Sequence, residues 1–235
     1  MLTMKKVPMF GATAHNVKRL YETAFPVEQR VPFWSLRLRS NMNGMEIVAY
    51  YDEDVFCGFA CLLATEKAVY LYYIAVADDK RNKGYGTQIL DDLKQRYPEK
   101  TIALDIEARD PRANDNEKRA ARCAFYLKNG FKASGYGFKD GGLFEIMVFG
   151  EKLEEPKAYA VLIDRLAFGL THTNVRPMSE VSPNHASKTI RNPGLVEEAL
   201  TRCLSSSRIF WDAERLAPHA APTRQAALCD IEQFV

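Results

Sequence analysis

The sequence contains no long run of apolar residues. No stretch of the 235-residue chain approaches the roughly 18 consecutive apolar positions that a membrane-spanning helix needs. The first residues, MLTMKKVPMFGA, carry two lysines but no continuous apolar segment of the kind that forms the core of a signal peptide. We therefore expect no membrane partner and no secretory leader, and the count of five cysteines fits the reducing conditions of a cytoplasmic location.

Metal-binding patterns and a strong charge of one sign are also missing. The five cysteines form no C-x-x-C pair and have no histidine partner at metal-ligand spacing, so no metal is expected. Cys57 and Cys61 fall within one apolar run and are predicted to be buried free thiols. The formal net charge is only +2, which gives no electrostatic reason to expect a nucleic-acid partner.

The composition is that of a chain with a real hydrophobic core. Hydrophobic residues make up 47% of the chain, and its length suits one medium domain with an extension. Apolar periodicity and turn residues predict two helices, three strands, and then helix, strand, helix and hairpin, which is an α/β (α+β) order with a mixed sheet. The predicted helices span residues 16–25, 31–38, 85–97 and 117–129, and the strands span 46–51, 55–65, 69–77, 101–107, 131–138 and 143–149.

The character of the sequence changes after Gly150. One additional helix is predicted over residues 156–168. Residues 171–193 are polar, contain three prolines and lack periodicity, so a linker or disordered segment is expected there, with two or three short helices conceivable in 194–235. The predicted organisation is a domain over 1–150, a helical segment over 151–170, and a C-terminal extension over 171–235 that is partly disordered or forms short helices.

A glycine turn joins an apolar strand to a helix within Tyr70–Pro98, YLYYIAVADDKRNKGYGTQILDDLKQRYP. A helix that begins after a strand presents unpaired N–H groups and about half a positive charge at its first turn. Gly84 and Gly86 allow backbone conformations and approaches that a side chain would forbid, and Arg81 and Lys83 add positive charge. The junction is therefore a candidate pyrophosphate site, with a plain turn bearing solvated basic residues as the alternative.

Two familiar nucleotide motifs do not fit this turn. A P-loop places its lysine after the second glycine, whereas here Thr87 follows Gly86 and Lys83 precedes it. A dinucleotide fingerprint needs a third glycine where Ile89 stands, although Asp105 lies where the ribose-binding acid of that motif would. The turn also follows a β-meander and does not open a βαβ unit, so both motifs are set aside.

A different pair of patterns occurs in one order along the chain. Arg81–Gly86 reads R-x-x-G-x-G after LYYIAVADDK, and Arg122–Tyr136, RCAFYLKNGFKASGY, carries an aromatic-Tyr pair followed by Gly-Phe. Together these segments resemble the acetyl-CoA motif and the later helix-to-strand signature of the GNAT N-acetyltransferase superfamily. The resemblance covers roughly residues 10–150. It implies a GNAT-like, mostly antiparallel central sheet flanked by helices, with acetyl-CoA as co-substrate and an amine as acceptor.

The resemblance also implies where acetyl-CoA is held. Pantetheine would lie in a gap between the strand ending near Val76 and the strand 101–107, with the main chain of Ile74 and Val76 pairing with its amides. The amides from Arg81 to Thr87 would take the pyrophosphate. The predicted cofactor-binding residues are Ile74, Val76, Arg81, Asn82, Lys83, Gly84, Tyr85, Gly86 and Thr87.

Two catalytic candidates follow from the same resemblance. Tyr126 corresponds to the general acid that protonates the departing sulfur, the alternative being a tyrosine that only packs beside Phe125. Glu107 is the candidate base, with a water chain to solvent as the alternative, because Tyr72 and Tyr73 stand where some relatives carry a glutamate.

The predicted helix over 117–129 also departs from the family pattern. Arg119 replaces a common asparagine seven residues before the tyrosine, and Asn116 either substitutes for it or caps the helix. Arg119 and Arg122 either orient this helix, contact CoA or form surface salt bridges.

The predicted function is transfer of an acetyl group from acetyl-CoA to a primary amine by direct attack in a ternary complex. The acceptor is left open between small-molecule and peptide amines, and a homodimer is also left open. Phe33, Trp34 and Phe138 either line an acceptor pocket or belong to the core. The alternative function is a non-catalytic acetyl-CoA-binding or protein-interaction module, suggested by the irregular C-terminal segment.

Overall fold

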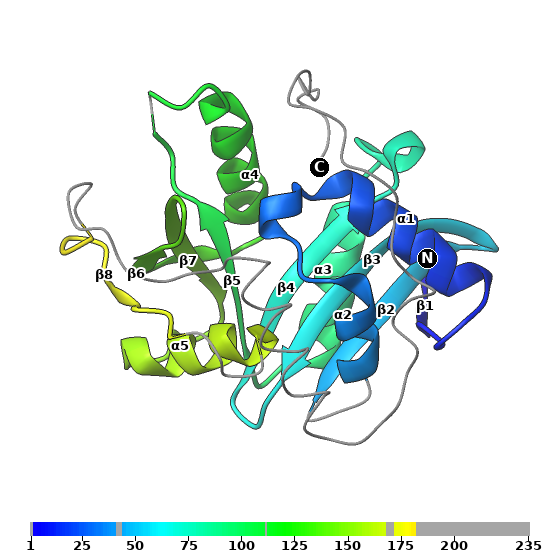
Figure 1. Ribbon diagram of the computed structural model, residues 1–235, viewed down its shortest axis with the longest axis horizontal. Coiled ribbons are helices and arrows are strands. Elements are labelled where there is room, and N and C mark those ends of the chain that lie inside the picture. Colours follow the sequence, from blue (N-terminus) through cyan, green and yellow to red (C-terminus); the bar gives the residue numbers. More distant parts are fainter. Residues whose placement is uncertain (1, 41–43, 111, 168–171, 182–235) are drawn as a thin grey trace, which may run out of the picture.

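The chain folds around one mixed β-sheet with helices on both faces (Figure 1). The structure is a computed structural model, and it describes residues 2–40, 44–110, 112–167 and 172–181. Within this part of the chain the strand order is β1-β2-β3-β4-β5-β7-β6-β8, and only the β4–β5 pair is parallel. The strands are β1 (Thr3–Lys6), β2 (Met45–Asp52), β3 (Val55–Ala64), β4 (Ala68–Val76), β5 (Thr101–Glu107), β6 (Lys132–Lys139), β7 (Leu143–Phe149) and β8 (Arg176–Pro177).

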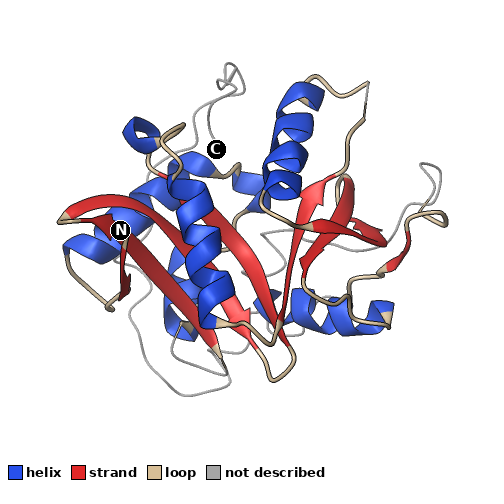
Figure 2. Ribbon diagram, turned by 180° about the vertical axis from the view of Figure 1, so that it is seen from behind, coloured by secondary structure: helices blue, strands red, loops and turns tan. Residues whose placement is uncertain are grey.

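The helices form two layers that cover opposite faces of the sheet. On one face lie α1, α2 and α5, which are in front in Figure 1, and on the other lie α3 and α4, which are in front in Figure 2. The helices are α1 (Ala12–Ala24), α2 (Phe33–Arg39), α3 (Tyr85–Arg96), α4 (Asn116–Lys128) and α5 (Pro156–Asp164), with 3-10 turns η1 (Val27–Gln29), η2 (Asp78–Lys80) and η3 (Arg165–Ala167).

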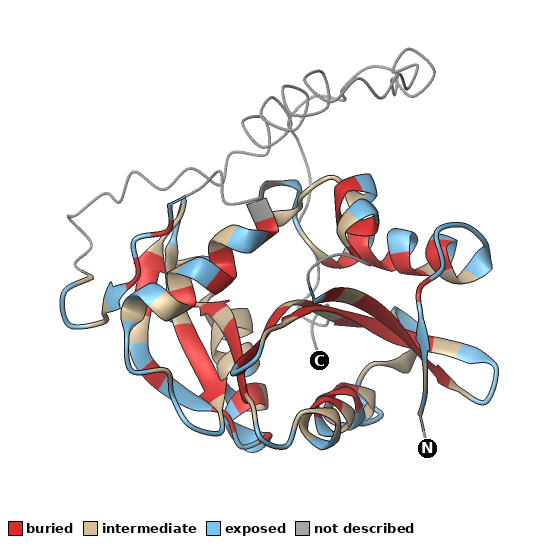
Figure 3. Cartoon of the chain, turned by 90° about the horizontal axis from the view of Figure 1, so that it is seen from below, coloured by how far each residue is buried: buried red, intermediate tan, exposed pale blue. Residues whose placement is uncertain are grey.

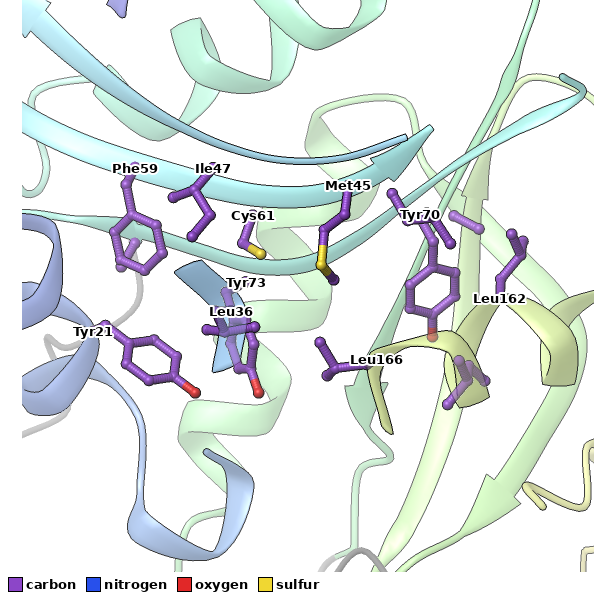
Figure 4. Close-up of a cluster of buried hydrophobic side chains, with 14 of the residues drawn as sticks. Tyr21, Leu36, Met45, Ile47, Phe59, Cys61, Tyr70, Tyr73, Leu162 and Leu166 are labelled. Carbon is purple, nitrogen blue, oxygen red and sulfur yellow. The ribbon is translucent and has the colours of Figure 1, made fainter. Parts of the chain in front are cut away.

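Two buried clusters hold these layers together. The first packs Tyr21 of α1 and Leu162 of α5 against one face of the sheet, as the close-up in Figure 4 shows. The second packs Ile89 and Leu93 of α3 and Tyr126 of α4 against the opposite face. Strands β2, β3 and β4 are covered on both faces, and their sequences are therefore continuous apolar runs without alternation of apolar and polar residues. Figure 3 shows buried residues along these strands of the sheet.

The predicted fold class is confirmed, and so is the order of its main helices and strands. The β6–β7 hairpin turns where the sequence predicts it, between Lys139 and Leu143. Cys57 and Cys61 are buried free thiols, as predicted. The helix predicted over residues 156–168 forms as α5 followed by the 3-10 turn η3.

Several expectations from sequence need correction. The expected linker over 171–193 contains an ordered piece, because β8 pairs with β6. Periodicity could not reveal β8 or the polar edge strand β1, since neither has an apolar alternation. Trp34 is 46% exposed and Phe138 is fully buried, so the structure places Phe138 in the core and Trp34 at the surface. The predicted short helices in 194–235 lie outside the described residues.

Two buried tyrosines, Tyr50 and Tyr126, and the half-buried Tyr97 should make the fold sensitive to alkali. Burial raises the pKa of Tyr97 and of Tyr126 to about 12, and it raises the pKa of Tyr50 even further. An unfolded tyrosine ionises near pH 10, so above about pH 10 the unfolded chain releases protons that the folded chain still holds. Stability is then lost progressively from about pH 10 to about pH 12. We expect a lower urea midpoint at about pH 11 than at about pH 8, whereas equal midpoints would contradict this assignment.

Among the helices that the structure describes, none is both long and apolar enough to cross a membrane.

Candidate active site

The parallel strands β4 and β5 separate after a short stretch of pairing. Only three residue pairs join them, from Ala68↔Thr101 to Tyr70↔Ala103, although β4 continues to Val76 and β5 to Glu107. Figure 1 shows the two strands diverging from their lower ends. On the edge toward β5, the second half of β4 therefore faces a gap, as the resemblance implies, while its other edge stays paired with β3.

A β-bulge lies in β4 at the start of this gap. The register between β3 and β4 shifts between Cys61 and Leu62, which leaves Tyr72 as the extra residue on β4. Because of this extra residue, Tyr72 and the following Tyr73 both pack on the face covered by α1 and α5. The bulge thus directs two tyrosines to one side of the gap, and sequence periodicity gives no sign of it.

The glycine turn forms a pocket with the neighbouring helix α4. Its volume is about 610 Å³. Asn82, at φ 59°, and Gly84, at φ 81°, adopt the left-handed conformation, which turns the chain sharply into the first turn of α3. The lining residues are Val76, Lys80, Arg81, Asn82, Gly84, Tyr85, Gly86, Thr87, Ala121, Ala124, Phe125 and Lys128. Seven of the nine predicted cofactor-binding residues are therefore brought together here.

The two glycines of the turn serve different purposes. A Cβ atom on Gly84 would have no neighbour within 4 Å, so the requirement for glycine there comes from the positive φ alone. A Cβ atom on Gly86 would lie 3.1 Å from Cζ of Phe125. The absence of a side chain at Gly86 thus allows α3 to pack closely on α4, a second reason for glycine there besides its place in the pocket lining.

The two basic residues of the motif also differ. Arg81 forms an ion pair with Asp78, and its Nε atom is buried without a hydrogen-bond partner among the described residues. Such a donor at a pocket wall fits an anionic ligand, because a buried donor without a partner is costly. Lys83 does not line the pocket, and its Nζ donates to the carbonyl of Asp79 at 2.8 Å. The contribution of Lys83 to a ligand would therefore come from its main chain.

The first residue of α3 is anchored to the meander. The hydroxyl of Tyr85 donates to Oδ2 of Asp52 at 2.7 Å. This hydrogen bond to a carboxylate raises the pKa of Tyr85 to about 12, so the hydroxyl stays a donor at neutral pH. Asp52 ends β2 and was not identified from sequence, because it reads as an ordinary turn residue.

A second pocket occupies the gap between β4 and β5. It adjoins the first along both β4 and α4, since Ile74 and Tyr126 line one pocket while Val76 and Phe125 line the other. The lining residues of this second pocket are Phe25, Gln29, Leu71, Tyr72, Tyr73, Ile74, Leu104, Asp105, Ile106, Glu107, Arg122, Tyr126, Phe144 and Leu166. Both predicted catalytic residues are among them.

Tyr126 presents a hydroxyl with no competing hydrogen bond. No group in the described part of the chain hydrogen-bonds it, and the ring packs edge-on against Phe125 and Phe131. Burial raises the pKa of Tyr126 to about 12, and the nearby Arg122 partly opposes this shift. The hydroxyl is therefore protonated over the whole neutral range and able to donate a proton.

Glu107 is engaged by several neighbours. Arg122 donates to Oε2 at 2.9 Å, Arg119 forms an ion pair with Oε1 at 3.6 Å, and the Gln29 amide donates to Oε1 at 3.4 Å. The side chains of Glu107 and both arginines are only 16–17% exposed. Of the roles left open for the two arginines, the structure supports orientation of α4, because they join this helix to β5.

The start of α4 contradicts one of the two sequence-based alternatives, that Asn116 caps the helix. Asp115 occupies the N-cap position, and Asn116 is the first helical residue. The Oδ1 atom of Asn116 is buried without a hydrogen-bond partner in the described part of the chain.

Within the described residues, no group of three or more histidine, cysteine, aspartate or glutamate side chains is arranged to hold a metal ion.

Comparison with protein families finds a match for the part of the chain that contains the glycine turn. Residues 43–133 match the family model described as an acetyltransferase (GNAT) domain. This range contains β2 to α4, which supply the glycine turn and most of the second pocket. Residues 43–133 are therefore similar to a GNAT acetyltransferase domain, and this match and the fold agree with the resemblance found from sequence. No curated protein sequence matches this chain.

Solved structures of the same fold agree at low sequence identity. A GNAT-family protein from Bacteroides thetaiotaomicron has a TM-score of 0.57 and 20% identity, covering 69% of this chain and 94% of its own. A GNAT-family protein from Desulfovibrio desulfuricans has a TM-score of 0.51 and 22% identity, covering 63% and 98%. An aminoglycoside 6'-N-acetyltransferase complexed with coenzyme A has a TM-score of 0.50 and 17% identity, covering 63% and 96%.

Proposed function

We propose that this protein transfers the acetyl group of acetyl-CoA to a primary amine by direct attack in a ternary complex. The observation that carries the proposal is the adjacency of the two pockets. The pocket at the glycine turn and the pocket lined by Tyr126 share α4 and the half of β4 that does not pair with β5. One extended ligand bound at the turn can therefore reach the hydroxyl, and the CoA complex of one structural neighbour supports this choice of ligand.

The residues at the turn fit a pyrophosphate. The first turn of α3 offers unpaired backbone N–H groups, and Arg81 adds a buried guanidinium with an unused donor. Along the gap, the main chain of Ile74 and Val76 would hydrogen-bond an extended amide chain as an added strand edge. When bound, acetyl-CoA supplies an activated thioester, and this chain supplies its orientation.

Proton transfer is assigned to groups of the second pocket. Tyr126 would donate a proton to the departing sulfur, because its hydroxyl is protonated and has no other acceptor in the described residues. The amine must lose a proton, and Glu107 and a water chain are the two candidates. Since both Glu107 oxygens already have cationic or amide partners, we favour the water chain and a role for Glu107 in holding α4 in place.

The substitution Glu107→Gln separates these two routes. With a water chain, kcat/KM should fall by less than about tenfold and its acidic limb should stay at the same pH, because general base catalysis is not removed. A loss of about 100-fold or more together with disappearance of the acidic limb would make Glu107 the base. Acetyl-CoA affinity, measured in parallel, reports any disturbance of α4.

Release of free CoA thiol tests the proposed function itself. Thiol release from acetyl-CoA should be slow without an acceptor and should increase in the presence of primary amines. Acetyl-CoA binding without amine-dependent release would support the alternative of a non-catalytic acetyl-CoA-binding module. The cytoplasmic location, a homodimer and the division at 150 and 170 stay predictions.

A further inference from the structure

Polar side chains of strand β2 reach helix α3 at three points. Successive side chains of a strand point to opposite faces, so residues 46, 48, 50 and 52 share the face of the sheet that α3 and α4 cover. Val48 belongs to the buried cluster on that face, and the other three side chains contact α3 with polar atoms. These contacts join Glu46 to Arg96 at 2.7 Å, Tyr50 to Asp92 at 2.8 Å, and Asp52 to Tyr85 at 2.7 Å. Strand β2 therefore holds α3 from its last residue to its first.

We propose that Asp52 is a positioning residue for acetyl-CoA: by holding the Tyr85 hydroxyl, it fixes the first turn of α3, whose amides take the pyrophosphate. Of the three contacts, this one lies at the glycine turn. Asp52 lines neither pocket and therefore acts through Tyr85 and not on the ligand. The inference rests on the proposed function, because it assigns a residue that prepares the site for the co-substrate of that reaction.

The first turn of α3 lacks a capping side chain. Gly84 is the N-cap residue, and it carries no side-chain oxygen that could accept a hydrogen bond from the amides of the first turn. Those amides are therefore left to water or to a ligand, and no cap fixes their direction. Tyr85 is the first helical residue, and its hydrogen bond to Asp52 provides this fixation from the side chain.

The β2–β3 hairpin also holds the chain on the other side of the glycine turn. The amide of Ala77, which follows β4 directly, donates to the carbonyl of Cys57 on β3 at 2.8 Å. Asp52 and Cys57 belong to the same hairpin, which the pair Asp52↔Val55 closes. Residues 78–84 are thus attached to one hairpin at both ends, through Ala77 and through Tyr85. Loss of the Tyr85 attachment would loosen the turn and leave the pairing of the sheet intact.

Arg81 lies between these two attachments. Its side chain is only 8% exposed, and its Nε atom is buried without a hydrogen-bond partner in the described part of the chain. A buried donor of this kind is costly unless a ligand accepts from it, which fits an anion at the turn. The position of this donor depends on the same attachments as the amides of α3. Asp52 is therefore expected to influence the whole pyrophosphate site and not a single amide.

Calorimetric titration of acetyl-CoA into full-chain variants tests the assignment without turnover. Asp52→Ala and Tyr85→Phe should each weaken binding by about tenfold, because each removes the same charge-assisted hydrogen bond. The double variant should also lose about tenfold and not about 100-fold, since both side chains act through one contact. Asp52→Asn keeps an oxygen for the Tyr85 hydroxyl and should recover most of the affinity. Losses that add in the double variant would overturn the assignment, because Tyr85 would then act independently of Asp52.

Tyr50→Phe is the matched control. It removes the hydrogen bond to Asp92, which is another contact between β2 and α3, and Tyr50 lines neither pocket. This variant should have a lower urea midpoint and an unchanged affinity for acetyl-CoA. If Tyr50→Phe weakens acetyl-CoA binding as much as Tyr85→Phe does, the contacts between β2 and α3 only support the fold, and the role of Asp52 is overturned.

Turnover adds a readout that a loss of stability would not produce. In Asp52→Ala the KM for acetyl-CoA should rise while kcat stays unchanged, because the candidate acid Tyr126 lies on α4 and not on α3. A fall in kcat with an unchanged KM would contradict a role in positioning the co-substrate.

Failure of this inference and failure of the proposed function give different results. If Asp52→Ala and Tyr85→Phe bind acetyl-CoA as tightly as the unmodified protein, and that protein acetylates amines, only the positioning role is overturned. If both variants lose affinity as expected but the unmodified protein releases no thiol with primary amines, the positioning role stands and the transfer reaction is overturned.

Discussion

Replacement of Gly84 by valine is expected to weaken acetyl-CoA binding by about 100-fold or more. We expect the substitution to remove two charge-assisted hydrogen bonds from the turn to the phosphates, and the binding free energy of two such bonds corresponds to about this factor. Gly84 has φ 81°, a conformation that β-branched residues resist. Nothing lies within 4 Å of an added Cβ, so the folded core is not disturbed. The valine would instead displace the amides of the turn and occupy the pocket. Calorimetric titration with acetyl-CoA measures the effect.

Gly141 provides a matched control for this substitution. It has φ 66° and no neighbour within 4 Å of an added Cβ, but it lies in the turn between β6 and β7 and lines neither pocket. Gly141→Val should have a comparable cost in stability and no effect on acetyl-CoA affinity. If both variants bind acetyl-CoA as the unmodified protein does, the turn is not the pyrophosphate site.

Replacement of Tyr126 by phenylalanine should lower kcat by about 100-fold, the usual lower range for a lost general acid. Acetyl-CoA affinity should be unchanged, because the hydroxyl has no hydrogen-bond partner in the described residues and the ring contacts with Phe125 and Phe131 remain. Burial raises the pKa of Tyr126 to about 12, so the acid stays protonated as the pH rises past 10. The rate of the unmodified protein should therefore show no alkaline loss from this group below about pH 11.

Tyr97→Phe is the corresponding control for Tyr126→Phe. The pKa of Tyr97 is likewise raised to about 12, but its hydroxyl donates to Glu46 and it lines neither pocket. This variant should keep its kcat. Equal rates for Tyr126→Phe and the unmodified protein across the pH range would place the acid elsewhere.

Local chemistry explains why the sequence predicts the geometry of the glycine turn well. The positive φ at Gly84, the helix start at Tyr85 and the pairing of β4 with its neighbours all depend on residues close together in the chain. The same holds for the α4 signature that contains Tyr126. Such features leave direct marks on spacing and residue type, and the motif is therefore specific.

The pocket between β4 and β5 depends on contacts between distant residues, and the sequence does not predict its lining. The bulge at Tyr72 reverses the alternation of β4, and only the pairing with β3 reveals it. The contacts of Glu107 with Gln29 and Arg122 span 78 and 15 residues, so its ion pairs are invisible to any local pattern. Leu166 reaches the pocket from a segment that sequence analysis treats as an appended helix.

The most direct test of the central claim follows the acetyl group itself. The protein is incubated with acetyl-CoA carrying a ¹³C-labelled acetyl group and a primary monoamine, and the products are separated and analysed by mass spectrometry. The proposed function predicts the label on the amine nitrogen, with one free CoA released per acetylated amine. Label that remains on CoA, or that appears only as acetate, would contradict it.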